Sequence, residues 1–500
     1  MPRSTRGTCA VAAAVLLTLT ACGSRADSSL RQQAAAAALG GTGGGSTGSG
    51  AGTGTGGTST GGTATGGSTT GTGGSTSGTG TGAGSTSGTS TSGTGGTTTG
   101  ATTGSSSGAP APAGGNGGST DVGVTGTSIT VGNISDVSGP RPGLFAGAVT
   151  GTQAYFAKIN STGGIFGRQL KVDVGDSQLD CAQNKQKTGD RVNKVFAYVG
   201  SFSLFDDCGT DVLKTHTDIP DVHAALGAAS QKLPNNFSIA PLGNGWRTGP
   251  LDYYAKTYGE AWKHVGAIYA GVGTGPSIYE NVKAAIAHSG GAYVYTESYG
   301  ATDTDFTATV VKMQQNGVQM IYVNTTDGPT GAYLVNAIRK QGLKWPIIFG
   351  ATAYAPDFLT HVDSGADEGV VNDQQFAQFF NADEAAATPE VAEFQKWMKV
   401  ANPNQQMDIF AAYGWASAEL FVTALKTAGA KAKRADVMKA LQGIHTFNSG
   451  GLFADADPSS KKPATCWILN TIKNHKFVRI NPTSATYNCT GGFYVNPAAK

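Results

Sequence analysis

The clearest pattern of apolar and polar positions lies in residues 129–168. Ile129 and Val131 alternate with polar neighbours, which predicts a β-strand. The pattern breaks at residues 135–140, and side chains then recur at three- and four-residue spacing, which predicts one long amphipathic helix. The positions with this helical spacing are Leu144, Phe145, Ala148, Val149, Thr152, Tyr155, Phe156 and Ile159.

A second strand completes this unit. Two glycines at 163–164 end the predicted helix, and Leu170, Val172 and Val174 alternate after them. A strand, helix and strand in this order form a β-α-β unit with parallel strands and a right-handed crossover. The turn at residues 138–143 therefore lies at the carboxyl end of the first strand, where open α/β sheets bind ligands.

The alternation of strands and helices continues almost to the end of the chain. The further predicted strands are 196–199, a short strand ending near His223, 237–240, 267–269, 292–295, 319–323, 346–349, 369–372, 466–471 and 476–480. The further predicted helices are 182–195, 205–216, 249–264, 277–289, 305–316, 330–341, 389–401, 408–428 and 434–443. This is more than one hydrophobic core supports, so we expect two doubly wound α/β lobes.

Composition changes this picture only at the N-terminal side. Of the 75 glycines, 33 lie in residues 40–118, which are almost entirely Gly, Ser, Thr and Ala. Such a segment has little to bury and is expected to be a flexible tether, with an r.m.s. span of roughly 50 Å. The formal net charge is +2 and no basic run occurs, so nothing favours a nucleic acid partner.

The first residues are typical of a secretory signal. Arg3 and Arg6 precede a short apolar stretch at 10–19, and residues 19–23 read Leu-Thr-Ala-Cys-Gly. This end resembles the bacterial lipobox, which implies a signal peptide over 1–21 and a diacylglycerol on Cys22. The alternative is an ordinary signal whose cysteine falls near the cleavage site. No later stretch of about 20 apolar residues occurs. We therefore expect residues 22–120 to be a lipid anchor and tether on the outer face of the bacterial cell membrane.

Four cysteines remain beyond the signal and the anchor. An even number in an oxidising compartment favours disulfides. Three pairings are open, and we favour Cys181–Cys208 and Cys466–Cys489 because each closes a short loop, worth on the order of 3 kcal/mol. Zinc is the rival use, but CxxC pairs and supporting histidines are absent. No metal or cofactor is expected.

Several residues in order resemble the type I periplasmic binding proteins of the branched-chain amino acid class. The strongest marks lie in the opening unit: Gly139-Pro140, Gly147, Gly151, Ala154, Ile159-Asn160 and Gly163-Gly164-Ile165-Phe166-Gly167-Arg168. Weaker marks follow at Asp176, Val199-Gly200-Ser201, Ile219-Pro220, Asp305-Phe306 and Glu368-Gly369. The resemblance covers roughly residues 127–495, and the first cysteine pair lies near a disulfide of some members.

The resemblance implies two lobes joined by three crossings, with a small-molecule ligand in the cleft between them. Lobe I would comprise 121–248 with 354–444, and lobe II 249–353 with 445–500. Ligand binding would close the hinge, and the permease subunits of an ABC importer would recognise the closed form.

In the amino-acid-binding members, lobe I holds the ligand carboxylate through hydroxyls and backbone N–H groups. Carried over to this chain, the matching positions are Ser138 with Arg141 beside it, Ser201, Ser203, His223 and Ala224. The serines of 200–203 have a second interpretation, in which they only cap the following helix. His223 also has a second interpretation, as a histidine of the core or rim whose hydrogen bonds are satisfied within the protein.

Lobe II departs further from the family. An acid that holds the ligand ammonium would fall near residues 350–354, where no carboxylate occurs. Asp327 is a candidate replacement, or else the N-cap of the following helix. The other candidate contacts are Thr274, Thr326, Thr352 and Tyr354. These departures leave an amino acid or a related carboxylate or amide as candidate ligands.

Three function classes follow. The leading one is a lipid-anchored solute-binding protein that feeds an ABC importer. The second is a surface receptor of the same fold that signals through a partner. An enzyme is disfavoured, because the predicted folded part contains no HExxH, P-loop or nucleophile-elbow motif.

Overall fold

A computed structural model describes residues 108–499. The predicted signal peptide, the lipidation site Cys22 and most of the predicted tether lie outside the described residues. The strands form a four-stranded sheet, a seven-stranded sheet and a two-stranded ribbon. Below, lobe I is the part built on the four-stranded sheet and lobe II the part built on the seven-stranded sheet.

Lobe I contains the β-α-β unit that the sequence predicts. Strands β1 (Ser128–Ser135) and β2 (Gln169–Asp176) pair in parallel over their full length. Helix α2 (Ala146–Asn160) connects them. Two short parallel strands, β3 (Tyr198–Val199) and β4 (Asp221–Val222), extend the sheet in the order β2-β1-β3-β4. The carboxyl ends of all four strands therefore meet at one edge.

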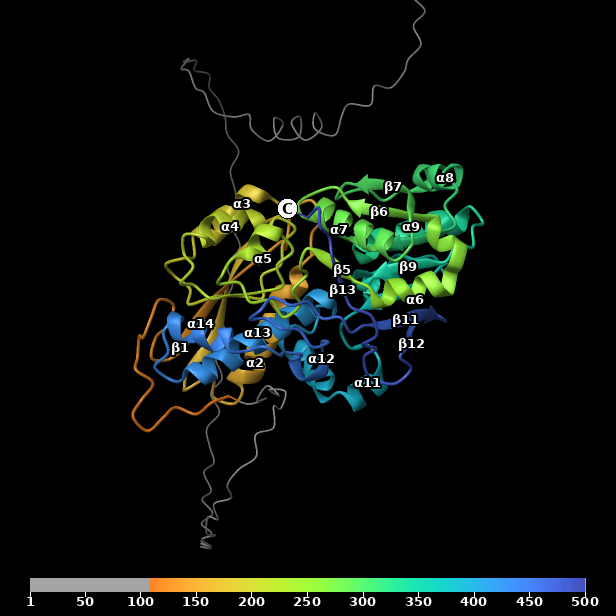
Figure 1. The fold of residues 1–500 in the computed structure, drawn as a ribbon. Coiled ribbons are helices and arrows are strands. Elements are labelled where there is room, and N and C mark those ends of the chain that lie inside the picture. Colours follow the sequence, from red (N-terminus) through yellow and green to blue (C-terminus); the bar gives the residue numbers. More distant parts are fainter. Residues whose placement is uncertain (1–107, 500) are drawn as a thin grey trace, which may run out of the picture. The chain divides into compact units, whose positions relative to one another are not determined.

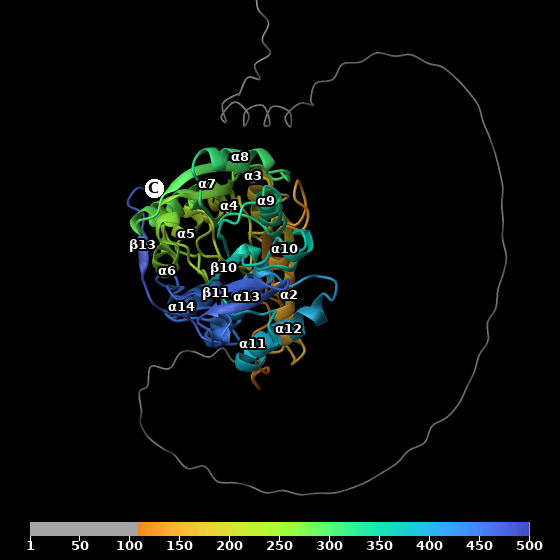
Figure 2. The same cartoon turned by 90° about the vertical axis from the view of Figure 1, so that its right-hand side faces the viewer.

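Helices cover both faces of this sheet (Figure 1). One face carries α3 (Cys181–Gly189) and α4 (Asp206–Leu213), and the other carries α2 and α13 (Ile409–Ala428). The remaining lobe I helices are α5 (Ala228–Lys232), α11 (Ala382–Ala387), α12 (Pro389–Ala401) and α14 (Arg434–Gln442). Figure 2 shows α12 beside α2 as well, in agreement with their contacts.

Two glycines allow α2 and α13 to approach closely. A Cβ atom on Gly151 would lie 1.9 Å from the carbonyl oxygen of Ala411, and one on Gly414 would lie 2.1 Å from that of Ala148. Both contacts are closer than any real Cβ atom makes. The glycine at position 151, one of the family marks, is therefore explained by helix packing.

Lobe II is a larger mixed sheet in the order β12-β11-β10-β9-β8-β6-β7. Its parallel strands are β6 (Val265–Ala270), β7 (Tyr293–Tyr299), β8 (Met320–Val323), β9 (Ile347–Gly350) and β10 (Val371–Gln374). The antiparallel strands β11 (Ile468–Lys473) and β12 (Lys476–Asn481) extend it on one side. Its helices are α6 (Gly249–Tyr258), α7 (Gly275–His288), α8 (Thr307–Gln315), α9 (Gly328–Lys340) and α10 (Pro356–His361).

The structure corrects two expected boundaries. Residues 445–500 were expected in lobe II, but Ser449–Gly451 packs on α12 and α13 of lobe I. We expected residues 354–444 in lobe I, but β10 pairs in parallel with β9 and in antiparallel with β11. The chain thus stays in lobe II until after β10. It crosses between the lobes near β5 (Gly245–Arg247), after β10 and before β11, and β5 pairs with β13 (Phe493–Val495) beside these crossings.

Two other expectations differ locally. Residues 237–240 form no strand, because only Asn236 bridges to β4 and the Ser238 hydroxyl then accepts a hydrogen bond from the Ala240 N–H, which turns the chain. Helix α3 ends at Gly189 rather than at 195. The turn that replaces its last residues is held by Arg434, which donates to the carbonyl oxygens of Val192 and Val195.

Both favoured disulfides are present. Cys181–Cys208 joins the start of α3 to α4, and Cys466–Cys489 joins the residues before β11 to those before β13. Within residues 108–499, no helix combines the length and the apolar character that a membrane crossing requires.

Arg168 fastens the beginning of the described chain to lobe I. Its Nη2 donates to the carbonyl oxygens of Asn116 and Gly118, and its Nε donates to that of Thr125. Its Nη1 donates to Ala430, in the connection between α13 and α14. A buried guanidinium with four backbone partners holds three chain segments together, which explains the arginine of the family mark in structural terms.

Candidate ligand-binding site

A cavity of about 160 Å³ lies between the two lobes. Its volume is roughly ten times what one water molecule needs, so it has room for a small organic molecule. Lobe I supplies the loops after β1, β3 and β4 together with the start of α13. Lobe II supplies the loops after β6, β8 and β9. This is the edge of a parallel sheet at which α/β proteins bind ligands.

Two contacts join the lobes across this cavity. The Arg141 guanidinium in the loop after β1 forms an ion pair with Asp327, which precedes α9. On another side, the Thr274 N–H donates to the Leu204 carbonyl oxygen at 2.9 Å. Because each contact joins one lobe to the other, the structure has the lobes closed over the cavity.

The lobe I wall of the cavity is mainly aromatic. Phe202, after β3, packs against Phe145 and Phe410 with ring centroids 4.8 and 5.0 Å apart. Tyr413 stacks on the same ring at 5.4 Å. Rings packed edge to face and stacked in this way form a rigid apolar surface. Leucines at 144, 204 and 226 extend it.

The lobe II wall combines small, apolar and hydroxyl side chains. Val272 and Ile278 contribute the apolar part. The Tyr299 hydroxyl donates to the Thr325 carbonyl oxygen at 3.1 Å and is thus satisfied within the wall. The Thr352 hydroxyl is buried and has no hydrogen-bond partner within the described residues. It is a polar group that a ligand can satisfy.

The hinge side of the cavity contains a second arginine. Arg247 of β5 forms a buried ion pair with Asp373 of β10, and its Nε donates at 3.1 Å. The Tyr322 hydroxyl donates to the other oxygen of that carboxylate at 3.3 Å. The charged residues that line the cavity are Arg141, Asp327 and Arg247, and each is paired within the chain.

Four residues predicted from the sequence line the cavity: Arg141, Thr326, Asp327 and Thr352. Asp327 has a structural role and also reaches the cavity. Its Oδ1 accepts from the Thr330 N–H at 2.9 Å, so it is the N-cap of α9. It also lines the cavity and pairs with the opposite lobe.

The predicted serines point elsewhere. Ser138 donates its hydroxyl to Asp176 of β2. The Ser201 hydroxyl accepts from the Ile134 N–H at 3.0 Å, and the Ser203 hydroxyl donates to Asp136 at 3.1 Å. These hydroxyls are satisfied at the end of the lobe I sheet, and none of them is part of the cavity lining.

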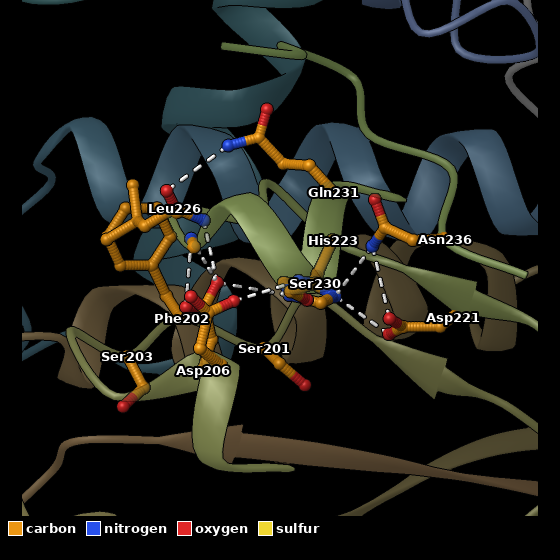
Figure 3. Close-up of polar contacts among 12 residues, drawn as sticks. Ser201, Phe202, Ser203, Asp206, Asp221, His223, Leu226, Ser230, Gln231 and Asn236 are labelled. Carbon is orange, nitrogen blue, oxygen red and sulfur yellow. Dashed lines mark hydrogen bonds and ion pairs between the residues drawn. The ribbon is translucent and has the colours of Figure 1, made fainter. Parts of the chain in front are cut away.

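His223 and Ala224 are also buried behind the wall. Figure 3 shows His223 between Asp221, 2.7 Å from its Nδ1, and Asp206, 3.9 Å from its Nε2. Burial lowers the pKa of His223, but the two carboxylates outweigh burial and raise its pKa to about 10. Asp206 in turn accepts from the Leu226 N–H at 2.6 Å. The buried cluster thus positions Leu226, which does reach the cavity.

Thr274 and Tyr354 also make contacts within the protein. Thr274 contributes its backbone N–H to the contact between lobes, and its hydroxyl is buried without a hydrogen-bond partner in the described part of the chain. The Tyr354 hydroxyl accepts from the Phe380 N–H at 3.0 Å, and its ring packs on Phe379 and Phe477 at 5.2 and 4.6 Å. Tyr354 is therefore a core aromatic rather than a cavity residue.

Most of the cavity residues missed by sequence reasoning are apolar, and Arg247, Asn324 and Gln375 are among the polar exceptions. Phe202 and Leu204 alternate with the predicted serines along one turn. This alternation was the available signal, because adjacent residues of an extended segment face opposite sides. Among residues 108–499, no cluster of three His, Cys, Asp or Glu side chains is placed to hold a metal ion.

Comparisons with known proteins agree with this architecture. The family model described as "Periplasmic binding protein" matches residues 128–476. The Leu/Ile/Val-binding protein homolog 1 of Brucella suis biovar 1 is 23% identical over 344 residues, which cover 67% of this chain and 88% of that protein.

Solved structures show the same fold. A fatty acid ABC transporter substrate-binding protein from Thermomonospora curvata aligns with a TM-score of 0.59 at 19% identity, over 78% of this chain and 97% of that one. A possible leucine/isoleucine/valine-binding protein from Rhodopirellula baltica aligns with a TM-score of 0.60 at 15% identity, over 71% and 96%. The chain therefore belongs to the type I periplasmic binding proteins, in the class of the branched-chain amino acid-binding proteins.

Proposed function

We propose that this protein is the extracytoplasmic solute-binding subunit of an ABC importer, which captures a small metabolite between its lobes by hinge closure. The candidate ligands are an amino acid or a related carboxylate or amide. The observation that carries the proposal is the cavity between the two sheets, bridged by contacts from one lobe to the other. A ligand that touches both lobes stabilises the closed state through its higher affinity for that state.

The comparisons support this role at the level of the family. One structural neighbour is named as the substrate-binding protein of a fatty acid ABC transporter and another as a putative branched-chain amino acid ABC transporter from Rhodospirillum rubrum. One name refers to fatty acids and the other to branched-chain amino acids, and both kinds of compound have an apolar part. The apolar cavity walls are consistent with such ligands.

The proposal includes the N-terminal sequence. Residues 1–21 are cleaved as a signal peptide, Cys22 receives a diacylglycerol, and the protein is held on the outer face of the cell membrane by a long tether. From there the closed form docks on the permease subunits of the importer. Radiolabelled palmitate incorporation tests the anchor, because Cys22→Ser removes the acceptor sulfur and abolishes the label.

Ligand capture is tested on the mature chain with two measurements. A ligand at 100 times its Kd raises the free energy of unfolding by about 2.7 kcal/mol, which appears as a higher melting temperature. Spin labels at Lys214 of lobe I and Val311 of lobe II, both exposed, report the distance between lobes. A ligand that raises the melting temperature and shortens this distance supports capture by closure. Tight binding with an unchanged distance distribution contradicts it.

A further inference from the structure

The charged groups of the cavity differ in what they can still bind. Both oxygens of Asp327 already accept hydrogen bonds: Oδ1 from Arg141 and the Thr330 N–H, and Oδ2 from the Thr330 hydroxyl at 2.9 Å. The carboxylate of Asp373 is likewise engaged by Arg247 and Tyr322. A ligand ammonium would therefore lose its water without gaining an uncommitted acid, which is costly.

Arg141, in contrast, still has hydrogen-bond donors available to a ligand. Within residues 108–499 its hydrogen bonds to Asp327 and Thr330 both use Nη2. Its Nη1 and Nε have no partner there, and the side chain lines the cavity. A guanidinium presents its donors as a planar fork that matches a carboxylate. The site is therefore equipped for an anionic head group and not for a cationic one.

The rest of the cavity is suited to an elongated apolar part of the ligand. Arg141 follows β1, Phe202 follows β3 and Leu226 follows β4. These three strands are consecutive neighbours in the sheet, so the first and last loops are ~10 Å apart at the usual strand spacing. Between them the wall consists of the aromatic cluster and leucines described above.

A second cavity adjoins the far end of this path. Four apolar side chains line both cavities: Leu226, Leu242, Trp246 and Ile278. Beyond them the second cavity is lined by polar amides of Gln231, Asn244, Asn281 and Asn496. The four shared side chains form the apolar boundary between the two cavities, called the partition below.

We propose that the ligand is an apolar monocarboxylate without an α-ammonium group, its carboxylate held by Arg141 and its chain extending to the partition at Leu226 and Ile278. This inference rests on the proposed function and specifies its substrate class. Arg141 selects the head group and Ile278 limits the chain length.

The test compares four chain lengths and three head groups. Butanoate, hexanoate, octanoate and decanoate are titrated into the mature chain by calorimetry, with leucine, octanamide and octylamine as head-group controls. We expect affinity to rise about fourfold for each methylene that becomes buried, up to the length at which the chain reaches the partition. Octanoate is expected to bind at least tenfold more tightly than leucine, octanamide or octylamine.

Two variants and one control test the roles of Arg141 and Ile278. Arg141→Gln is expected to weaken octanoate at least tenfold and to leave octanamide within threefold of the parent, because Gln can still donate to the neutral amide oxygen but does not carry the charge that pairs with the anion. Lys185→Gln removes one exposed positive charge from lobe I outside the cavity and is expected to change neither ligand. Ile278→Trp is expected to abolish the gain from hexanoate to octanoate while hexanoate binding is retained.

Different results contradict the ligand class and capture by closure. Tighter binding of leucine or octylamine than of octanoate, or equal losses of octanoate and octanamide in Arg141→Gln, overturns the ligand class. If leucine binds and brings the spin labels together, capture by closure stands and this inference falls. If octanoate binds through Arg141 without any change in the label distance, the ligand class stands and capture by closure falls. Absence of binding by every carboxylate also overturns the inference.

Discussion

Arg141 of lobe I and Asp327 of lobe II form an ion pair across the ligand cavity. Both side chains are partly exposed, so the pair contributes on the order of 1 kcal/mol or less to closure. We expect Asp327→Asn to shift the spin-label distances towards longer values. Asparagine is an equally good N-cap, so the free energy of unfolding should change little.

The matched control for this substitution is Asp211→Asn. Asp211 pairs with Lys185 and Lys214 on the exposed surface of lobe I and does not reach lobe II. Its replacement should leave the distances between lobes unchanged. An identical distance distribution in Asp327→Asn and the parent would show that the ion pair does not contribute to closure.

Gly273 is a steric determinant of closure. A Cβ atom there would lie 2.2 Å from the Leu204 carbonyl oxygen of the other lobe, and its φ is +54°. We expect Gly273→Ala to hold the lobes apart and to weaken ligand binding at least tenfold, about 1.4 kcal/mol. Calorimetric titration of a confirmed ligand measures this loss.

Gly317→Ala separates backbone strain from the clash between lobes. Its φ is +73°, and a Cβ atom there would contact nothing within 4 Å. Both variants carry the cost of an L residue in the left-handed region, roughly 1 kcal/mol of stability. Only Gly273→Ala should lose affinity. Equal affinities in the two variants would mean that closure does not need the close approach at Leu204.

The buried His223 gives stability a defined pH dependence. Its pKa is raised from 6.5 to about 10 in the folded chain by Asp221 and Asp206, which outweigh the effect of burial. The folded state therefore binds more protons than the unfolded state between these two values. The free energy of unfolding should fall as pH rises from about 6.5 to about 10, by up to a few kcal/mol.

Chemical denaturation across this pH range measures the effect. His223→Gln should remove the part of the slope that His223 contributes and lower stability at neutral pH, because it leaves two buried carboxylates without their cation. His361→Gln, at an exposed position at the end of α10, should keep the parent slope. A parent and His223→Gln with the same slope would exclude His223 as its source.

Arg168 should be more important for stability than its position near the start of the fold implies. Lysine cannot reproduce four hydrogen bonds to backbone carbonyl oxygens, so Arg168→Lys should cost about 2–3 kcal/mol. Limited proteolysis should then cut near residues 116–125 before the rest of the domain. Arg339→Lys is a useful comparison, since Arg339 bonds carbonyl oxygens within lobe II only. If Arg168→Lys unfolds at the same denaturant concentration as the parent, the hydrogen bonds of Arg168 do not stabilise the fold.

The fold was predictable to a large extent because its signals are local. Hydrophobic periodicity predicts α2 and α13 and the pairing of β1 with β2, and short loops between cysteines favour the observed disulfides. The placement of β10 was not predictable in this way. Strand partners are chosen by tertiary packing, and nothing in residues 369–372 indicates which of the two sheets this strand joins.

The site was harder to predict because the type of a side chain does not determine its direction. In the turn after β3, Ser201 and Ser203 face the sheet end and Asp136, while Phe202 and Leu204 between them face the cavity. The bridge between Ser135 and Phe202 continues the alternation of the strand into this turn. Carrying over hydroxyls by residue type therefore selected the side of this alternating segment that does not line the cavity.

The attachment of the described chain to lobe I has a mechanical consequence. Ala109 bridges to Ile165, and Arg168 then binds the carbonyl oxygens of Asn116 and Thr125. The N-terminal part of the chain is therefore joined to lobe I. In the anchored protein proposed above, lobe I is the lobe that carries the attachment, and closure moves lobe II relative to it. The permease proposed above would then meet closure as the approach of the lobe II loop at Gly273 to Leu204 of lobe I.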